Sequence, residues 1–210
     1  GQKLTSSVGA RQTLEKSADK VDLHVKLKSN SRYLEGFGIG TCHYGNCLGA
    51  AGWHLDGSGV HIEIKESGLV DVAFGLVEMG QGAKTVVAQM TAEAFGLTVG
   101  QISVLPTNTN LVPDSGPSVA SRNVVMTGNA ILDASKKILP ILKNAGSKLL
   151  NCNPIDININ NGIVTNNLTG NAIEFSKVTE FLYQNEMMMK VDGWWHTPKL
   201  DYNFETGTGE

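Results

Sequence analysis

Two short turns rich in small residues, at 77–82 and 113–122, each open directly onto a helical pattern. The first four backbone N–H groups of a helix have no partner inside it, and the helix dipole favours negative charge at that end. Two such ends in one domain predict a cradle for a phosphate-bearing or otherwise anionic cofactor.

Apolar periodicity along the chain mixes helical and extended segments without a regular strand–helix–strand repeat, which predicts the α+β fold class. The predicted helices cover 7–28, 83–97, 117–149 and 175–183, with Pro140 bending or dividing the third. The predicted extended segments are a hairpin over 62–76, a glycine-rich stretch at 36–42, a strand at 102–106, a second hairpin turning at Asn161-Gly162, and a segment around 194–196.

Length and charge limit the classes of function. A chain of 210 residues can bury a full core, either as one large domain or as two small lobes with a boundary near residue 150. The formal net charge of −3, without a concentrated basic run, argues against nucleic acid as the main partner. The longest apolar runs are too short to span a bilayer, and neither end has the character of a natural terminus. We therefore expect a piece of a longer polypeptide that does not enter a membrane.

Three cysteines, Cys42, Cys47 and Cys152, indicate a reduced, cytoplasmic protein rather than a disulfide scaffold. The Cys42–Cys47 spacing begins one class of iron–sulfur pattern, but the remaining cysteines of that pattern are absent. His43 lies between them without a fourth ligand at a spacing that suits zinc. The prediction is buried thiols in a strand, and no direct metal ligand.

The first turn places Gly80, Gln81 and Gly82 between a strand end and a helix. Glycine lets the backbone approach a ligand, and the Gln81 amide can donate and accept hydrogen bonds at once. The alternative is an ordinary strand-to-helix turn in which the glycines only satisfy backbone dihedrals.

The second turn carries a capping pattern. Ser115 or Gly116 can cap a helix whose first position is Pro117, a residue favoured there. Asp114 fits equally a cap or a repulsive neighbour of a phosphate. The alternative is a well-capped helix with nothing bound.

Beyond that cap, the pattern leaves the backbone amides of Ser118, Val119 and Ala120 free, and the hydroxyls of Ser118 and Ser121 beside them. Arg122 is then expected to supply the charge that compensates a bound anion.

The ordered strings at 77–85, 113–121 and 127–130 resemble the xanthine dehydrogenase family of molybdenum hydroxylases. More narrowly, they are similar to its molybdopterin-binding subunit or domain, with the match running from about 36 to 130 and more weakly to the end. The resemblance implies that 1–210 is a fragment of one molybdopterin-binding domain.

The resemblance also assigns site residues. It implies contacts to the cofactor from Gly80, Gln81, Gly82, Ser118, Ala120 and Ser121, and a substrate pocket lined by Thr41, Cys42 and His43. Family members often place an aromatic residue and a threonine in that pocket segment, so Thr41 and Cys42 are a departure that bears on the substrate.

The implied cofactor is molybdopterin with its molybdenum, with the cytosine dinucleotide form as one option. The family oxidises electron-poor heterocycles with water as the oxygen source, and passes electrons through [2Fe–2S] clusters to FAD on other domains or subunits. A purine is the favoured substrate class, followed by nicotinate-like heterocycles and aldehydes, and the assembly is expected to be an oligomer. A non-catalytic binding module of the same fold is the alternative.

The family's general-base glutamate lies in a glycine-rich string beyond the point where this sequence stops. Glu210 stands in a similar string but too soon after 204–206 to be that base. No catalytic residue is therefore assigned within this chain, which by itself should be catalytically incomplete.

Overall fold

The computed structural model describes residues 9–23, 37–42, 48–52, 55–187, 189–199, 202–203, 205–206 and 208–209. The chain divides into two compact units, one made of 45–199 and the other of 1–44 together with 200–210. The sub-lobe boundary near residue 150 stays a prediction.

The smaller unit holds one helix and one strand pair. Helix α1 (Ala10–Lys20) is exposed along its length except at Ala18, and strands β8 (Tyr202–Asn203) and β9 (Thr208–Gly209) pair antiparallel. The helix predicted over 7–28 is confirmed at its centre, whereas 24–28 lie outside the described residues. Residues 37–42 belong to no helix or strand, and Cys42 is exposed. The prediction of a buried thiol in a strand is therefore wrong for Cys42.

The larger unit is built on a four-stranded sheet in the order β3-β2-β1-β7. Its strands are β1 (Gly57–Ile64), β2 (Val70–Phe74), β3 (Ile102–Val104) and β7 (Lys190–His196). Strand β1 pairs antiparallel with β2 and with β7, and β2 pairs parallel with β3. Alternate residues of β1 point to the core, where Val60, Ile62 and Ile64 are fully buried. The predicted first hairpin is confirmed.

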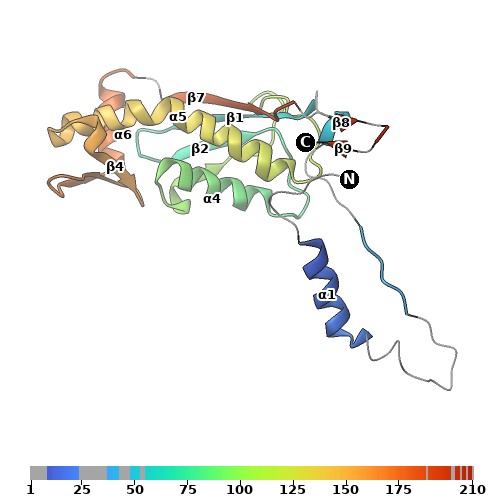
Figure 1. The fold of residues 1–210 in the computed structure, drawn as a ribbon. Coiled ribbons are helices and arrows are strands. Elements are labelled where there is room, and N and C mark those ends of the chain that lie inside the picture. Colours follow the sequence, from blue (N-terminus) through green and yellow to red (C-terminus); the bar gives the residue numbers. More distant parts are fainter. Residues whose placement is uncertain are drawn as a thin grey trace. The chain divides into compact units, whose positions relative to one another are not determined.

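Two helices, α4 (Ala83–Phe95) and α5 (Arg122–Leu150), cover this sheet (Figure 1), and the short 3-10 turn η2 (Val99–Gln101) leads into β3. They pack closely, since a Cβ at Gly128 of α5 would lie 2.9 Å from the Met90 sulfur of α4. The long helix starts at Arg122, five residues later than predicted, and continues through Pro140 without dividing.

A small sheet lies at the far end of α5 (Figure 1). Its strands β4 (Ile157–Asn160), β5 (Ile163–Asn166) and β6 (Ala172–Glu174) run in that order, with helix α6 (Phe175–Gln184) after them and the turn η3 (Pro154–Asp156) before them. The Gly162 N–H donates to the Gly96 carbonyl at 3.0 Å, which ties this hairpin to the end of α4. The second predicted hairpin and the short helix are confirmed, as is the α+β class.

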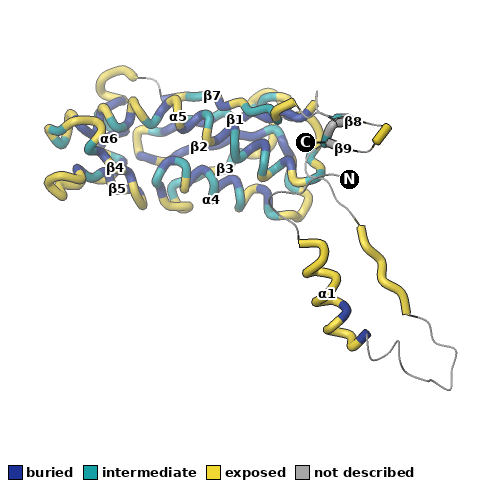
Figure 2. The backbone as a smooth tube through the Cα atoms, in the orientation of Figure 1, coloured by how far each residue is buried: buried dark blue, intermediate teal, exposed yellow. Residues whose placement is uncertain are grey.

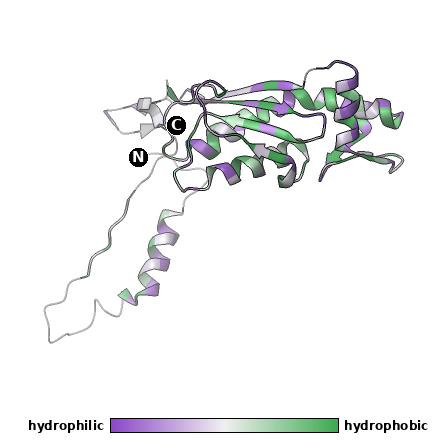
Figure 3. Ribbon diagram, turned by 180° about the vertical axis from the view of Figure 1, so that it is seen from behind, coloured by the Kyte–Doolittle hydropathy of each residue, from purple (hydrophilic) through white to green (hydrophobic). Residues whose placement is uncertain are grey.

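The apolar side chains meet in one continuous core in the larger unit. Figure 2 shows the buried residues lining the inner sides of the sheet and of α4 and α5, and Figure 3 shows the apolar residues concentrated on the same elements. Val87, Phe95, Ile131 and Leu142 from the helices face Ile62, Val72 and Phe74 from the strands. Among the described residues, no helix has both the length and the hydropathy needed to cross a bilayer.

Side chains of α5 bond two backbone groups of the edge strand β7. The Asp133 carboxylate accepts the Trp194 N–H at 3.0 Å, and the Lys137 ammonium donates to the Asp192 carbonyl at 2.8 Å. Asp133 and Lys137 also form an ion pair of 2.6 Å with each other. Two backbone groups that would otherwise be open on an edge strand are thereby satisfied.

We expect Gly193→Ala to destabilise the larger unit, because the added Cβ would lie 2.0 Å from the Ala130 carbonyl oxygen. Overpacking of this kind costs about 1–3 kcal/mol, measurable as a lower midpoint of urea unfolding. Gly100→Ala is the matched control, since its Cβ would have no neighbour nearer than 4.0 Å. Equal midpoints for the two variants would contradict the close packing of β7 on α5.

Candidate functional site

The N-terminal ends of α4 and α5 lie side by side, which brings the two small-residue turns together. The Val77 N–H donates to the Ser118 hydroxyl at 2.7 Å, and the Asn123 amide donates to the Val77 carbonyl at 3.3 Å. Residues 41 positions apart in the sequence are therefore in direct contact. Asn123 was not predicted from the sequence, because nothing in its local pattern separates it from an ordinary helix residue.

The first turn is shaped by its own glutamine. The Gln81 amide nitrogen donates to the Val77 carbonyl at 2.8 Å, and its oxygen accepts the Met79 N–H at 2.6 Å. The side chain donates and accepts within its own turn, and its contact with a cofactor stays a prediction. Gly80 and Gly82 lie in the left-handed region, with φ of 101° and 81°, and a Cβ on either would meet nothing within 4 Å. The outer face of this turn is open.

The N-terminus of α4 already holds a carboxylate, that of Glu78. It accepts the backbone N–H groups of Gly80, Gly82 and Lys84 at 2.8, 3.0 and 3.1 Å. The hydrogen bonds from Lys84 and Gly82 hold the pKa of the Glu78 carboxyl below its ordinary value. The expectation of two open helix ends is therefore wrong for α4. The sequence signal was Glu78, an acidic residue within the first turn and just ahead of α4, where carboxylates are favoured.

The second turn leaves successive amides free. Ala120 and Ser121 lie in the left-handed region, with φ of 48° and 69°. Within the described part of the chain, the backbone N–H groups of residues 118–121 have no acceptor. Successive amides without an acceptor are donors that suit an anion.

The predicted cap is not formed. Ser115 is buried, where its hydroxyl accepts the Gly59 N–H at 3.2 Å and donates to the Pro113 carbonyl at 3.2 Å. Asp114 accepts the Gly116 N–H at 3.0 Å in a local turn. These bonds fix the loop against the sheet, so the helix begins only after it.

This loop approaches β2 so closely that only glycine fits at position 75. A Cβ on Gly75 would lie 2.3 Å from the Pro113 carbonyl oxygen. The position of the second turn is thus set by backbone packing against the sheet.

Arg122 is fully buried and does not face a ligand. Its Nε donates to the Asp56 carboxylate at 2.7 Å, with both side chains at most 1% exposed. Its other donors reach the backbone carbonyls of Leu55, Gly57, Ser115 and Pro117. The expectation that Arg122 compensates a bound anion is wrong: this charge is already neutralised by Asp56, a partner 66 positions away that no sequence pattern indicated.

The predicted substrate pocket falls on the smaller unit. Thr41 and Cys42 are exposed there, and His43 lies outside the described residues. Their role stays a prediction. The described residues also contain no group of three or more His, Cys, Asp or Glu side chains placed to hold a metal ion.

The sequence profile of the family described as molybdopterin cofactor-binding domain matches residues 13–210. The chain belongs to this family. Its curated relatives include xanthine dehydrogenases, which confirms the resemblance to the xanthine dehydrogenase family.

Two of these relatives illustrate the extent of the match. Xanthine dehydrogenase 2 of Arabidopsis thaliana is 29% identical over 155 residues, which is 74% of this chain and 10% of that protein. A probable xanthine dehydrogenase subunit of Bacillus subtilis (strain 168) is 30% identical over 151 residues, which is 71% of this chain and 20% of that protein. The chain thus spans about a tenth to a fifth of these relatives.

Solved structures share the fold. The aldehyde oxidoreductase of Desulfovibrio gigas matches with a TM-score of 0.64 at 22% identity, covering 99% of this chain and 20% of that one. Quinoline 2-oxidoreductase of Pseudomonas putida 86 matches with a TM-score of 0.62 at 21% identity, covering 67% of this chain and 19% of that one. Both establish the architecture of this chain.

The residues present fit an anionic cofactor at one of the two helix ends. The unpaired amides of 118–121 offer donors, and the open face of Gly80 and Gly82 leaves room for a ligand beside them. The Ser118 hydroxyl links the two turns through Val77. The donors at the α5 end are of a kind that an anionic group, such as one in the family's cofactor, can accept.

We expect Asp56→Ala to destabilise the larger unit by about 3–5 kcal/mol, because it leaves the buried Arg122 guanidinium without its counter-charge. The change is measured as a fall in the free energy of urea unfolding. Lys177→Ala is the control, since its pair with Glu180 is exposed and worth at most about 1 kcal/mol. Similar losses of unfolding free energy in the two variants would show that the buried pair contributes no more than an exposed one.

We expect Glu78→Gln to remove a pH dependence of stability. A lowered folded pKa means that the Glu78 carboxylate stabilises the protein above its unfolded pKa, and that this contribution is lost as the pH falls through the folded value. The wild type should therefore unfold at a higher temperature than the variant at pH 7, and the difference should shrink as the pH falls below the ordinary glutamate pKa of about 4.3. A difference that is the same at both pH values would contradict this role.

Proposed function

We propose that this chain is the part of a molybdenum hydroxylase that binds one side of molybdopterin, in an enzyme that oxidises a purine or related N-heterocycle with water as the oxygen source. The observation that carries the proposal is the row of unpaired amides at 118–121 beside the open glycine turn at 80–82. Membership of the molybdopterin cofactor-binding domain family supplies the identity of the ligand.

The residues of this chain would hold and orient the cofactor. Residues 118–121 donate backbone N–H groups to its anionic part, and Ser121 adds an exposed hydroxyl beside them. Gln81 fixes the facing turn through Val77 and Met79, so that Gly80 and Gly82 stay open toward the ligand. When bound, molybdopterin supplies the redox chemistry, while the protein supplies position and polarity.

The N-terminal end of α5 has no free positive charge from Arg122 to offer a ligand. Arg122 is neutralised by Asp56, and Glu78 occupies the α4 end. Binding at 118–121 therefore relies on neutral backbone N–H donors of the protein and not on a cationic side chain. Such donors suit an anionic group whose charge is spread over several atoms.

The finer assignments are proposals as well. We infer a purine substrate from the xanthine dehydrogenases among the relatives, and Thr41, Cys42 and His43 as pocket residues from the family resemblance. The proposal also includes FAD and [2Fe–2S] clusters on other domains or subunits, and the cytosine dinucleotide form of the cofactor. It further includes an oligomeric assembly and a cytoplasmic location.

An aldehyde or nicotinate substrate is the alternative within the enzyme class, favoured by the fold shared with the aldehyde oxidoreductase. A non-catalytic binding module of the same fold is the alternative outside it. Molybdenum and pterin in the native protein would separate the module from the enzymes, and turnover of purine against aldehyde would separate the substrates.

We expect Gln81→Ala and Ser121→Ala in the full-length protein to lower its molybdenum and pterin content. Each removes hydrogen-bonding groups that shape or line the site, and one net hydrogen bond is worth about 1 kcal/mol, or about fivefold in affinity. Molybdenum is measured by elemental analysis and pterin by fluorescence after release.

Gln184→Ala, an exposed amide at the end of α6, is the control and should keep full occupancy. Far-ultraviolet circular dichroism should be unchanged in all three variants, because both site residues are exposed. Full molybdenum content in both site variants would refute the assignment of these residues. Absence of molybdenum from the matured wild type would favour the binding module.

A further inference from the structure

A small pocket opens at the opposite end of the larger unit from the two turns, where β1, α6 and β7 meet. It encloses about 240 Å³ and is lined by Glu63, Ile64, Tyr183, Glu186, Met187, Met189 and Lys190. Such a volume corresponds to about eight water molecules, and it is smaller than a typical site for a cofactor. It suits a single side chain better than a whole ligand.

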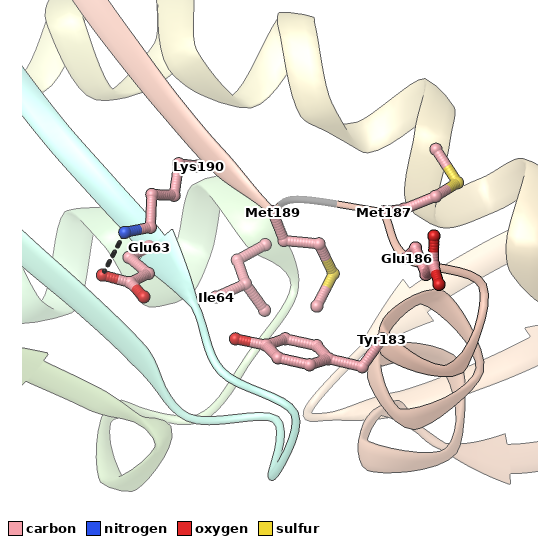
Figure 4. A pocket seen from close by; sticks show the side chains of 7 residues that line it. All are labelled: Glu63, Ile64, Tyr183, Glu186, Met187, Met189 and Lys190. Carbon is pink, nitrogen blue, oxygen red and sulfur yellow. Dashed lines mark ion pairs between the residues drawn. The ribbon is translucent and has the colours of Figure 1, made fainter.

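The centre of the pocket is apolar and partly aromatic. Ile64 and Met189 are 0% and 3% exposed and form its floor. Figure 4 shows the Tyr183 ring beside them, with Met187 and Glu186 on one side and Glu63 with Lys190 on the other. Tyr183 and Met187 are 41% and 43% exposed, so their apolar surface is open to a partner.

The charges at the two ends differ. Glu63 is paired with Lys65 at 3.1 Å and with Lys190 at 3.4 Å, so its charge is compensated. Within the described residues, the Glu186 carboxylate has neither an ion pair nor a hydrogen bond. Glu186 also lies in the left-handed region with φ of 57°, where the chain reverses from α6 toward β7. The pocket therefore has an unpaired negative charge at one end and an aromatic ring along its apolar centre.

We propose that this pocket receives an arginine side chain from another part of the full-length protein. A guanidinium can pair with the Glu186 carboxylate, and the alkyl stem behind it can cover Met187, Met189 and the Tyr183 ring. Arginine is also the cation preferred at protein interfaces.

The source of that arginine follows from the size of the relatives. This chain spans 10% and 20% of two related proteins, so most of a protein of this family lies outside it. The inference rests on the proposed function only in taking the chain to work within such a larger protein. The pocket itself is separate from the proposed cofactor site.

Oxidation of Met187 by hydrogen peroxide, located by tandem mass spectrometry, tests this interface. In the full-length protein Met187 should oxidise about tenfold more slowly than in the 210-residue chain alone, because oxidation follows exposure. Glu186→Gln in the full-length protein should raise the rate of Met187 oxidation about fivefold. It should also expose one arginine outside this chain to phenylglyoxal.

Glu93→Gln, an exposed acid on α4, is the matched control and should change neither readout. Met189 reports on folding, since it is 3% exposed and should oxidise slowly in every sample with an intact core. In the 210-residue chain, n-butylguanidinium should protect Met187, and the neutral n-butylurea should not.

Equal oxidation of Met187 in the chain and in the full-length protein would overturn the proposal. Equal protection of Met187 in the wild type and in Glu186→Gln would overturn it too. So would equal protection of Met187 by n-butylguanidinium and n-butylurea, because the pocket would then be covered by apolar contact alone. Glu186→Gln should leave the molybdenum content unchanged. A failure here is therefore distinguishable from a failure of the proposed function, which would lower the molybdenum content of the wild type.

Discussion

The buried pair of Asp56 and Arg122 is the interaction on which the site depends. Five hydrogen bonds from the guanidinium use all five of its N–H donors, one to the carboxylate and four to backbone carbonyls. A buried ion pair offsets the cost of losing water only when its remaining donors are satisfied in this way. Because these carbonyls belong to 55–57 and 115–117, one side chain joins the start of β1, the second turn and the first residue of α5.

The two helix ends differ as a consequence of how each turn uses its polar groups. In the second turn, Arg122 takes the carbonyls of Ser115 and Pro117 on the inner side, and the amides of 118–121 are left on the outer side. In the first turn, Glu78 takes the amides for itself. An anion that approaches this region meets donors on one turn and a carboxylate on the other. This contrast restricts where and how a ligand can be oriented.

The sequence predicted the elements whose signal is local. Alternation in β1 and β2 and the helical period of α4 come from residues that face one core, and these elements formed as expected. The start of α5 was predicted wrongly, because Ser115 and Pro117 make a good local capping pattern. That pattern was overridden by contacts to Gly59 and Asp56, which lie more than 50 positions away. The pairing of Arg122, the role of Glu78 and the contact of Asn123 are likewise decided by tertiary structure, which a local pattern does not encode.

The ion pair of Asp133 and Lys137 on the outer edge of β7 has a consequence for the behaviour of the isolated domain. An open edge strand invites another strand to add to it, either from a second copy or from an unfolded chain. Here one N–H and one carbonyl of β7 are already bonded to side chains of α5. The larger unit thus offers a less open edge at β7 to a second copy or to an unfolded chain.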